Sequence, residues 1–142
     1  MSYNSVMKAS DAVREFHAAF NIPKVHPTNI EAVKLRLRLI REEYLEVLKA
    51  AGWTEWEDGN CQTYLSRIGE MDSLNLLKEL ADLAYVVYGT AEAFGWDLDE
   101  AVKRVHESNM TKLGEDGKPI YREDGKVLKG QNYKEPYLGD LV

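Results

Sequence analysis

Cysteine is almost absent from this sequence of 142 residues, where Cys61 stands alone. A single cysteine excludes a disulfide framework within the chain and is typical of a protein from a reducing compartment. No apolar run reaches the roughly eighteen residues of a membrane-spanning helix, and the N-terminus lacks the apolar core of a secretory signal. We therefore expect a cytoplasmic protein that has no membrane partner.

Basic residues are also in deficit. The chain has 24 acidic and 18 basic residues, which gives a formal net charge of −6. This balance argues against nucleic-acid binding, including binding by a helix-turn-helix. With 44% hydrophobic and 30% charged residues, the composition is that of an ordinary globular protein. The length predicts one domain over 1–142.

Apolar residues recur at helical spacing in four segments of the chain. We expect helices over 3–20, from Thr28 to about Ala51, from Asp72 or Ser73 to Phe94, and from Asp97 to about Asn109. Thr28 opens a capping-box pattern, and Gly52 suits the position after a helix end. These segments predict an all-α, antiparallel helical bundle with a core over about 3–110.

Two segments lack helical periodicity. For residues 53–71 we expect a loop that includes at most one helical turn. The tail, 111–142, contains several glycines and lysines, and we expect it to be basic where the helices are acidic. Within it, the turn dipeptide Asp124-Gly125 lies between short apolar pairs, which indicates a small hairpin or an ordered loop.

Three glutamates lie on an apolar face of the second expected helix. At about 100° per residue, Glu42, Glu43 and Glu46 fall within roughly 100° of arc. Leu35 and Leu39 share that face, while the basic residues of this helix occupy a different sector. The three carboxylates are therefore not placed as a solvated charge run would be.

The third expected helix carries the matching acids. Glu79 and Asp82 are three residues apart and hence neighbours on one face. Asp82 is the only charged residue from Leu80 to Ala91, and a helix that is apolar on nearly every side is normally central and buried. We therefore expect Glu79 and Asp82 to lie in the interior.

Five carboxylates in apolar surroundings predict a cation. Burying an unpaired carboxylate costs several kcal/mol, so the group must either protonate or bind a positive ion. Oxygen-only ligands, with no cysteine or histidine among them, favour Mg²⁺ or Mn²⁺. A di-iron bundle would need Glu-x-x-His pairs, and a glutamate precedes none of the three histidines at that spacing.

The order of these motifs resembles a known superfamily. Glu43-x-x-Glu46 followed by Glu79-x-x-Asp82 is similar to the paired motifs of the all-α nucleoside triphosphate pyrophosphohydrolases, which include MazG, the phosphoribosyl-ATP pyrophosphohydrolases and dimeric dUTPase-like enzymes. Residues 106–112 and the loop 116–133 resemble the Asn/Lys segment and following loop of MazG-like proteins. The resemblance implies a bundle completed by homo-oligomerisation, as a homodimer or a tetramer.

The resemblance also implies a reaction, the hydrolysis of a nucleoside triphosphate to the monophosphate and pyrophosphate. Mg²⁺ would be the cofactor, with Mn²⁺ as a substitute, and dUTP or dCTP the substrate by analogy. It implies metal ligands at Glu43, Glu46, Glu79 and Asp82, a general base at Glu42, and phosphate contacts at Asn109, Lys112 and Lys129. The alternatives are hydrolysis of phosphoribosyl-ATP and a non-catalytic helical nucleotide-binding module.

Overall fold

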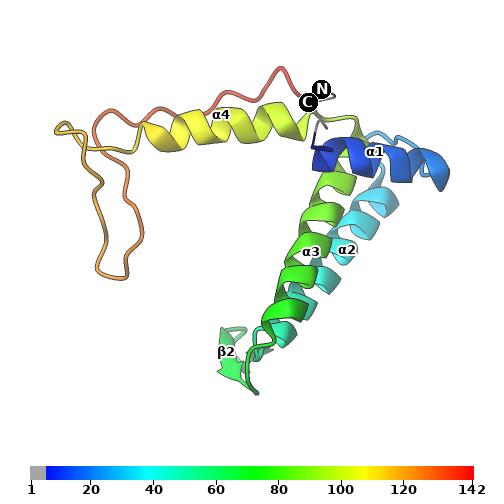
Figure 1. Cartoon of the computed structure of the whole chain (residues 1–142), viewed down its shortest axis with the longest axis horizontal. Helices are drawn as coiled ribbons and strands as arrows, with labels where there is room; N and C mark the ends of the chain where they lie inside the picture. Colours follow the sequence, from blue (N-terminus) through cyan, green and yellow to red (C-terminus); the bar gives the residue numbers. More distant parts are fainter. Residues whose placement is uncertain (1–5) are drawn as a thin grey trace, which may run out of the picture. The chain divides into compact units, whose positions relative to one another are not determined.

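The chain divides into two compact units in a computed structural model that describes residues 6–142 (Figure 1). The first unit runs to Gly95 and contains α1 (Ala9–Ala19), α2 (Ile30–Ala50), β1 (Trp53–Glu57), β2 (Thr63–Arg67) and α3 (Ser73–Phe94). The second, Trp96–Val142, contains α4 (Leu98–Met110) and the tail. Helices dominate, so the all-α class is confirmed, but α4 groups with the tail and not with the other helices.

Side-chain caps fix where three of the helices begin. Asn29, Asp72 and Asp97 each accept a hydrogen bond from the backbone amide three residues further on, at 3.0–3.1 Å. The expected start of α2 at Thr28 is therefore wrong by one residue. The Thr28 hydroxyl instead pairs with His26 Nδ1 at 2.8 Å, before the helix begins.

The helix ends largely follow the sequence. Gly52 and Gly95 adopt φ of +84° and +75° just after α2 and α3, as expected for glycines that terminate helices. A Cβ at Gly52 would lie 2.4 Å from the carbonyl oxygen of Gly69, so no other residue fits there. The first helix is shorter than expected: 6–8 are not helical, and 3–5 lie outside the described residues.

Residues 53–67 form an antiparallel hairpin, so the prediction that 53–71 is a loop with one helical turn is wrong. Trp56 lies opposite Tyr64, and their rings stack with centroids 4.8 Å apart. The Asp58 carboxylate closes the turn by accepting hydrogen bonds from the backbone amides of Asn60 and Gln62. Trp53, Thr54 and Trp56 before the Asp58-Gly59 turn, and Thr63 and Tyr64 after it, favour strands and are the signal for this hairpin in the sequence.

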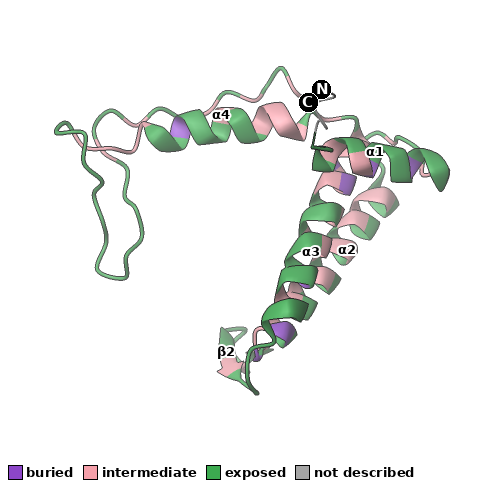
Figure 2. Ribbon diagram, viewed as in Figure 1, coloured by how far each residue is buried: buried purple, intermediate pink, exposed green. Residues whose placement is uncertain are grey.

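The antiparallel helices α2 and α3 lie side by side and form the body of the first unit (Figure 1). The core they share with α1 is small: the buried apolar residues are Val13, Ala50, Ala91 and Ala93. Along α3, Leu74 and Leu77 are 86% and 68% exposed, and much of the helix is coloured as exposed in Figure 2. The expectation that α3 is enclosed on all sides is therefore not met within one chain.

The tail forms a minimal hairpin, which is one of the two alternatives that the Asp124-Gly125 dipeptide indicated. Tyr121 and Val127 make an antiparallel bridge, flanked by the backbone bond from Leu128 N–H to the Ile120 carbonyl at 2.7 Å. Gly125 adopts φ of +85°, which the tight turn requires. Between residues 6 and 142, no helix combines the length and hydrophobicity needed to cross a membrane.

Candidate metal centre

Three carboxylates from α2 and α3 converge in the first unit. Glu43 comes from α2, and Glu79 and Asp82 lie one turn apart on α3. Each offers an oxygen, and the three oxygens lie within 4.8 Å of one another. The antiparallel pairing of the two helices thus brings together residues separated by almost forty positions in the sequence.

Burial and mutual repulsion give this cluster its electrostatic character. Glu79 is only 5% exposed, and Glu43 and Asp82 are partly buried. The pKa of Glu43 is raised above its ordinary value, first by burial and then by the neighbouring charges of Asp82 and Glu79. The cluster therefore holds negative charge at a cost, which a cation would relieve.

Lys78 lies within the cluster, and the sequence reasoning assigned it no role. Its Nζ is 2.9 Å from Asp82 Oδ2 and 3.2 and 3.3 Å from the two carboxylate oxygens of Glu79. These hydrogen bonds, first to Asp82 and then to Glu79, raise the pKa of Lys78 and keep its ammonium charged. The spacing of four residues between Lys78 and Asp82 on a helix was the signal available in the sequence.

Glu42 and Glu46 lie outside the three-carboxylate cluster. Both side chains are exposed on α2, on either side of Glu43 along the chain. Glu46 follows Glu43 by about one helical turn, so it lies on the neighbouring turn of the same helix. Their predicted roles as general base and fourth ligand stay predictions.

An apolar cavity of about 550 Å³ lies between α1, α2 and α3. Leu39, one turn before Glu43, and Val86, one turn after Asp82, both line it. Because α2 and α3 are antiparallel, one turn back along α2 and one turn forward along α3 both point toward the same end of the helix pair. The cavity therefore adjoins the carboxylate cluster. Tyr85 also lines the cavity.

Two basic side chains line this otherwise apolar cavity. His17 from α1 is 6% exposed, and Arg36 from α2 lies beside it. Gly89 on α3 makes room for them, since a Cβ there would lie 3.3 Å from His17 Nε2. The pKa of His17 is lowered by burial and then by Arg36, against an opposing effect of Glu92. The sequence reasoning gave His17 no function, and its position became apparent only from the packing of α1.

The predicted phosphate-binding residues lie in the second unit. Asn109 is exposed at the end of α4, and its carbonyl accepts the backbone amide of Lys112 at 3.1 Å. Lys129 Nζ sits over the ring of Tyr133, 4.3 Å from its centroid, as a cation–π contact. Of the two predicted lysines, the Lys129 ammonium is thus held by a contact within this unit.

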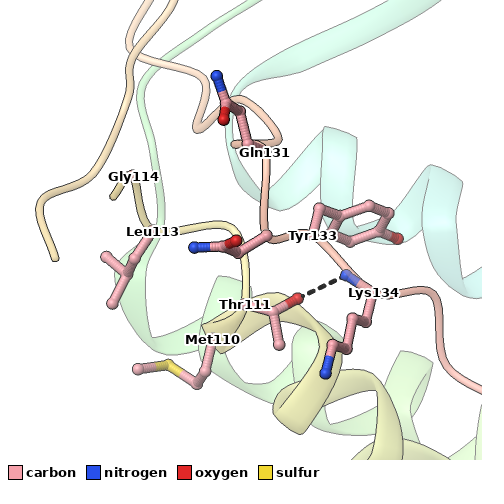
Figure 3. A pocket seen from close by; sticks show the side chains of 8 residues that line it. Met110, Thr111, Leu113, Gly114, Gln131, Tyr133 and Lys134 are labelled. Atoms are coloured by element: carbon pink, nitrogen blue, oxygen red, sulfur yellow. Dashed lines mark hydrogen bonds between the residues drawn. The ribbon is translucent and has the colours of Figure 1, made fainter. Parts of the chain in front are cut away.

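A pocket of about 510 Å³ lies between the end of α4 and the returning tail (Figure 3). Its lining includes Leu113, Gln131 and Tyr133, but not Asn109, Lys112 or Lys129. Thr111 Oγ1 accepts a hydrogen bond from the backbone amide of Lys134 at 2.9 Å, which ties the two sides together. These contacts shape the pocket mainly with backbone and uncharged groups.

The tail as a whole is not basic, contrary to expectation. Residues 111–142 contain six basic and six acidic side chains, and the excess of positive charge is confined to 112–134. One of the basic groups there, Arg122, is paired with Asp124, with Nε 2.8 Å from Oδ1. The remaining basic groups of that stretch are lysines.

Comparison with known proteins identifies the family. The phosphoribosyl-ATP pyrophosphohydrolase family matches residues 13–109, more than half of the chain and the whole of the carboxylate cluster. The match ends before Lys112 and Lys129.

Individual relatives are more distant. Uncharacterized protein L479 of Acanthamoeba polyphaga mimivirus is 29% identical over 125 residues, which are 83% of this chain but 41% of the viral protein. The chain therefore spans about two fifths of the length of that relative. A solved structure of a candidate NTP pyrophosphohydrolase from Exiguobacterium sp. 255-15 aligns with a TM-score of 0.42 and 22% identity, over 92% of this chain and 89% of that one. On the family match, the chain belongs to the phosphoribosyl-ATP pyrophosphohydrolase family.

Proposed function

We propose that the protein hydrolyses a nucleoside triphosphate to the monophosphate and pyrophosphate. The observation that carries the proposal is the convergence of Glu43, Glu79 and Asp82 on a helix pair that falls within the family match. Family membership supports pyrophosphohydrolase chemistry in general. The cluster is where a metal-bound polyphosphate would be held.

The three carboxylates fit Mg²⁺. They offer only oxygen ligands, and two oxygens on opposite sides of an octahedral Mg²⁺ lie about 4 Å apart. The observed spread of up to 4.8 Å needs only small side-chain rotations to reach that distance. A divalent ion would also neutralise the repulsion that raises the pKa of Glu43. Mn²⁺, with similar ligand preferences, would substitute.

The carboxylates of α2 and α3 would have two roles, metal binding and proton transfer. Glu43, Glu79 and Asp82 would hold the ion, with Glu46 as a fourth carboxylate one turn along α2. When bound, Mg²⁺ neutralises phosphate oxygens and stabilises negative charge at phosphorus. Glu42, exposed next to Glu43, would accept a proton from the attacking water.

The adjoining cavity would bind the nucleoside. It is apolar, it abuts the cluster, and Tyr85 offers a ring against which a base can pack. His17 and Arg36 supply the hydrogen-bond donors that would distinguish one base from another. We place dUTP or dCTP first by family analogy. Phosphoribosyl-ATP is the second candidate, favoured by the family to which the chain belongs.

Asn109, Lys112 and Lys129 would contact the phosphates. An amide and two ammonium groups are suitable donors for phosphate oxygens. Lys129 would have to exchange its cation–π contact with Tyr133 for such a contact.

A second copy of the chain would cover the exposed apolar face of α3. Leu74 and Leu77 are exposed on that helix, and Met71, 58% exposed, precedes it. A homodimer would remove these side chains from water, each worth about 1.5–3 kcal/mol when fully buried. Light scattering should report a dimer or tetramer, and Leu77→Glu should lower the measured mass. A monomeric parent protein would contradict this assembly.

The decisive experiment is an assay of canonical and modified nucleoside triphosphates, and of phosphoribosyl-ATP, with Mg²⁺. The products should be pyrophosphate and a monophosphate, resolved by ³¹P NMR. A chelator should abolish turnover, as should Asp82→Asn. Orthophosphate and a diphosphate as the first products would contradict the proposed reaction. Nucleotide binding without turnover would identify a non-catalytic module.

A further inference from the structure

Lys78 is the cationic partner of the candidate metal ligands. Among the ion pairs of residues 6–142, it is the only basic side chain that contacts Glu79 or Asp82. Its Nζ reaches three carboxylate oxygens at 2.9–3.3 Å, while its side chain remains 65% exposed. The ammonium is therefore held inside the cluster by a chain that is free to swing into solvent.

The ammonium and a divalent ion compete for the same oxygens. Mg²⁺ binds carboxylate oxygens at about 2.1 Å. An ion on the Asp82 oxygen that Lys78 contacts would therefore lie at most about 5 Å from Nζ, given the 2.9 Å bond between them. Two positive charges on one ion and one on the ammonium repel strongly at that separation.

We propose that Lys78 is a tethered counter-ion that occupies the cluster in the absence of a divalent cation and is displaced when one binds. The inference rests on the metal site of the proposed function. It means that the intrinsic affinity of the three carboxylates is higher than the affinity the protein displays. It also explains how Glu79, at 5% exposure, remains tolerable without a metal ion.

An opposite role for Lys78 makes an opposite prediction. If Lys78 served to orient Glu79 and Asp82 for the metal, its removal would scatter the ligands and weaken metal binding. A displaced counter-ion, in contrast, must be moved before the metal binds, so its removal strengthens binding. The sign of the change in affinity therefore separates the two roles.

The test is a calorimetric titration of the chelator-treated full chain with Mn²⁺ and Mg²⁺, without nucleotide. Lys78→Met should lower the Kd for each ion by roughly threefold to tenfold, the range expected for losing competing ion pairs at a partly exposed site. Lys78→Arg, which keeps the charge, should stay near the parent. Lys34→Met is the matched control, because Lys34 pairs with Glu31 on the same helix as Glu43 at 3.1 Å. It lies roughly 13 Å along the axis from Glu43, beyond the Debye length of about 10 Å at 0.1 M salt.

A second measurement guards against misfolding of the variant. Without metal, Lys78→Met should unfold at a lower temperature than the parent, and saturating Mn²⁺ should close that gap. Equal or weaker metal binding by Lys78→Met than by Lys34→Met overturns the inference. If the parent binds neither ion, the metal site and this inference fail together. If the parent binds and Lys78→Met matches Lys34→Met, only the role of Lys78 fails.

Discussion

The carboxylate cluster and the tail are held by different kinds of interaction. Glu43, Glu79 and Asp82 sit on two packed helices whose register fixes each side chain relative to the others. The stretch 112–134 has one isolated bridge, several backbone turns and a few side-chain bonds. Helical register carries side-chain positions over long distances in the sequence, whereas turns fix only the backbone nearby. The three carboxylates are therefore preorganised, whereas the positions of the lysine side chains depend on the groups that they contact.

The largest effect should follow from removing a ligand inside the cluster. Asp82→Asn should weaken Mg²⁺ or Mn²⁺ binding by at least about 100-fold, since the loss of groups that merely orient ligands already costs about 10–100-fold. Glu46→Gln, outside the cluster of three, tests whether a fourth carboxylate takes part and should also weaken binding. Calorimetry measures both.

Glu31→Gln is the control for both variants, because Glu31 is an exposed acid at the start of α2 that pairs only with Lys34 among the ion pairs of the described chain. It should leave the metal affinity unchanged. Unaltered affinity in both Asp82→Asn and Glu46→Gln would remove the metal assignment.

The next largest effect concerns the lysines of the tail. Lys112→Ala and Lys129→Ala should each lower turnover by roughly tenfold, the loss expected when one charge-assisted hydrogen bond to phosphate disappears. Neither should change the metal affinity of the nucleotide-free protein, because an ammonium cannot ligate a cation. Steady-state kinetics and calorimetry together separate the two effects.

Lys126→Ala provides the comparison within the same stretch, since Lys126 is an exposed lysine of the hairpin. Its turnover should stay close to that of the parent protein. If all three alanine variants turn over substrate as fast as the parent protein, Lys112 and Lys129 bind no phosphate and the tail serves the structure of its own unit.

A smaller change should appear in hydrogen exchange. Fixing one residue of the backbone costs about 1–2 kcal/mol, and the tail has few buried side chains to offset that cost. Mg²⁺ with a non-hydrolysable triphosphate should therefore slow exchange across 112–133 more than in α3 over 76–88. Mass spectrometry of the peptides resolves the two regions. Equal protection of both, or none in the tail, would contradict closure of the tail over the ligand.

The difference between the regions also explains which features the sequence could predict. The periods of α2 and α3 place Glu43, Glu79 and Asp82 on matching faces, so the cluster follows from helix geometry once the helices pack. The end of α3 at Gly95 and the Asp72 cap are equally local signals. The helix ends, and the face on which each acid lies, need no knowledge of distant contacts. Only the meeting of the two faces depends on how α2 packs against α3.

Other features depend on contacts that no local pattern encodes. The hairpin over 53–67 was missed because its strands are short, and its stability comes from cross-strand pairs such as Trp56 and Tyr64. The burial of His17 depends on how α1 packs against α3, where Gly89 leaves room for it. The exposure of α3 cannot be predicted from its sequence, because an apolar helix indicates that something covers it but not whether the cover belongs to the same chain.

The smallest effect should be a dependence of stability on the protonation of His17. Burial and Arg36 lower the pKa of His17 in the folded protein below its ordinary value of 6.5, so between the two values the unfolded chain binds the proton and the folded chain does not. The contribution of neutral His17 to the free energy of unfolding is therefore fully present above about pH 6.5. It is lost as the pH falls through the pKa of His17 in the folded protein. The midpoint of thermal unfolding, measured at fixed protein concentration between pH 8 and pH 5, should decline over that window. In His17→Gln the decline should be smaller, because the remaining acid dependence belongs to the carboxylates. The control is His106→Gln, which replaces an exposed histidine on α4 and should keep the parent profile. Identical profiles for His17→Gln and the parent would mean that the cavity accepts the imidazolium as readily as water does, and the first unit would then be less tightly packed around α1 than the burial of His17 indicates.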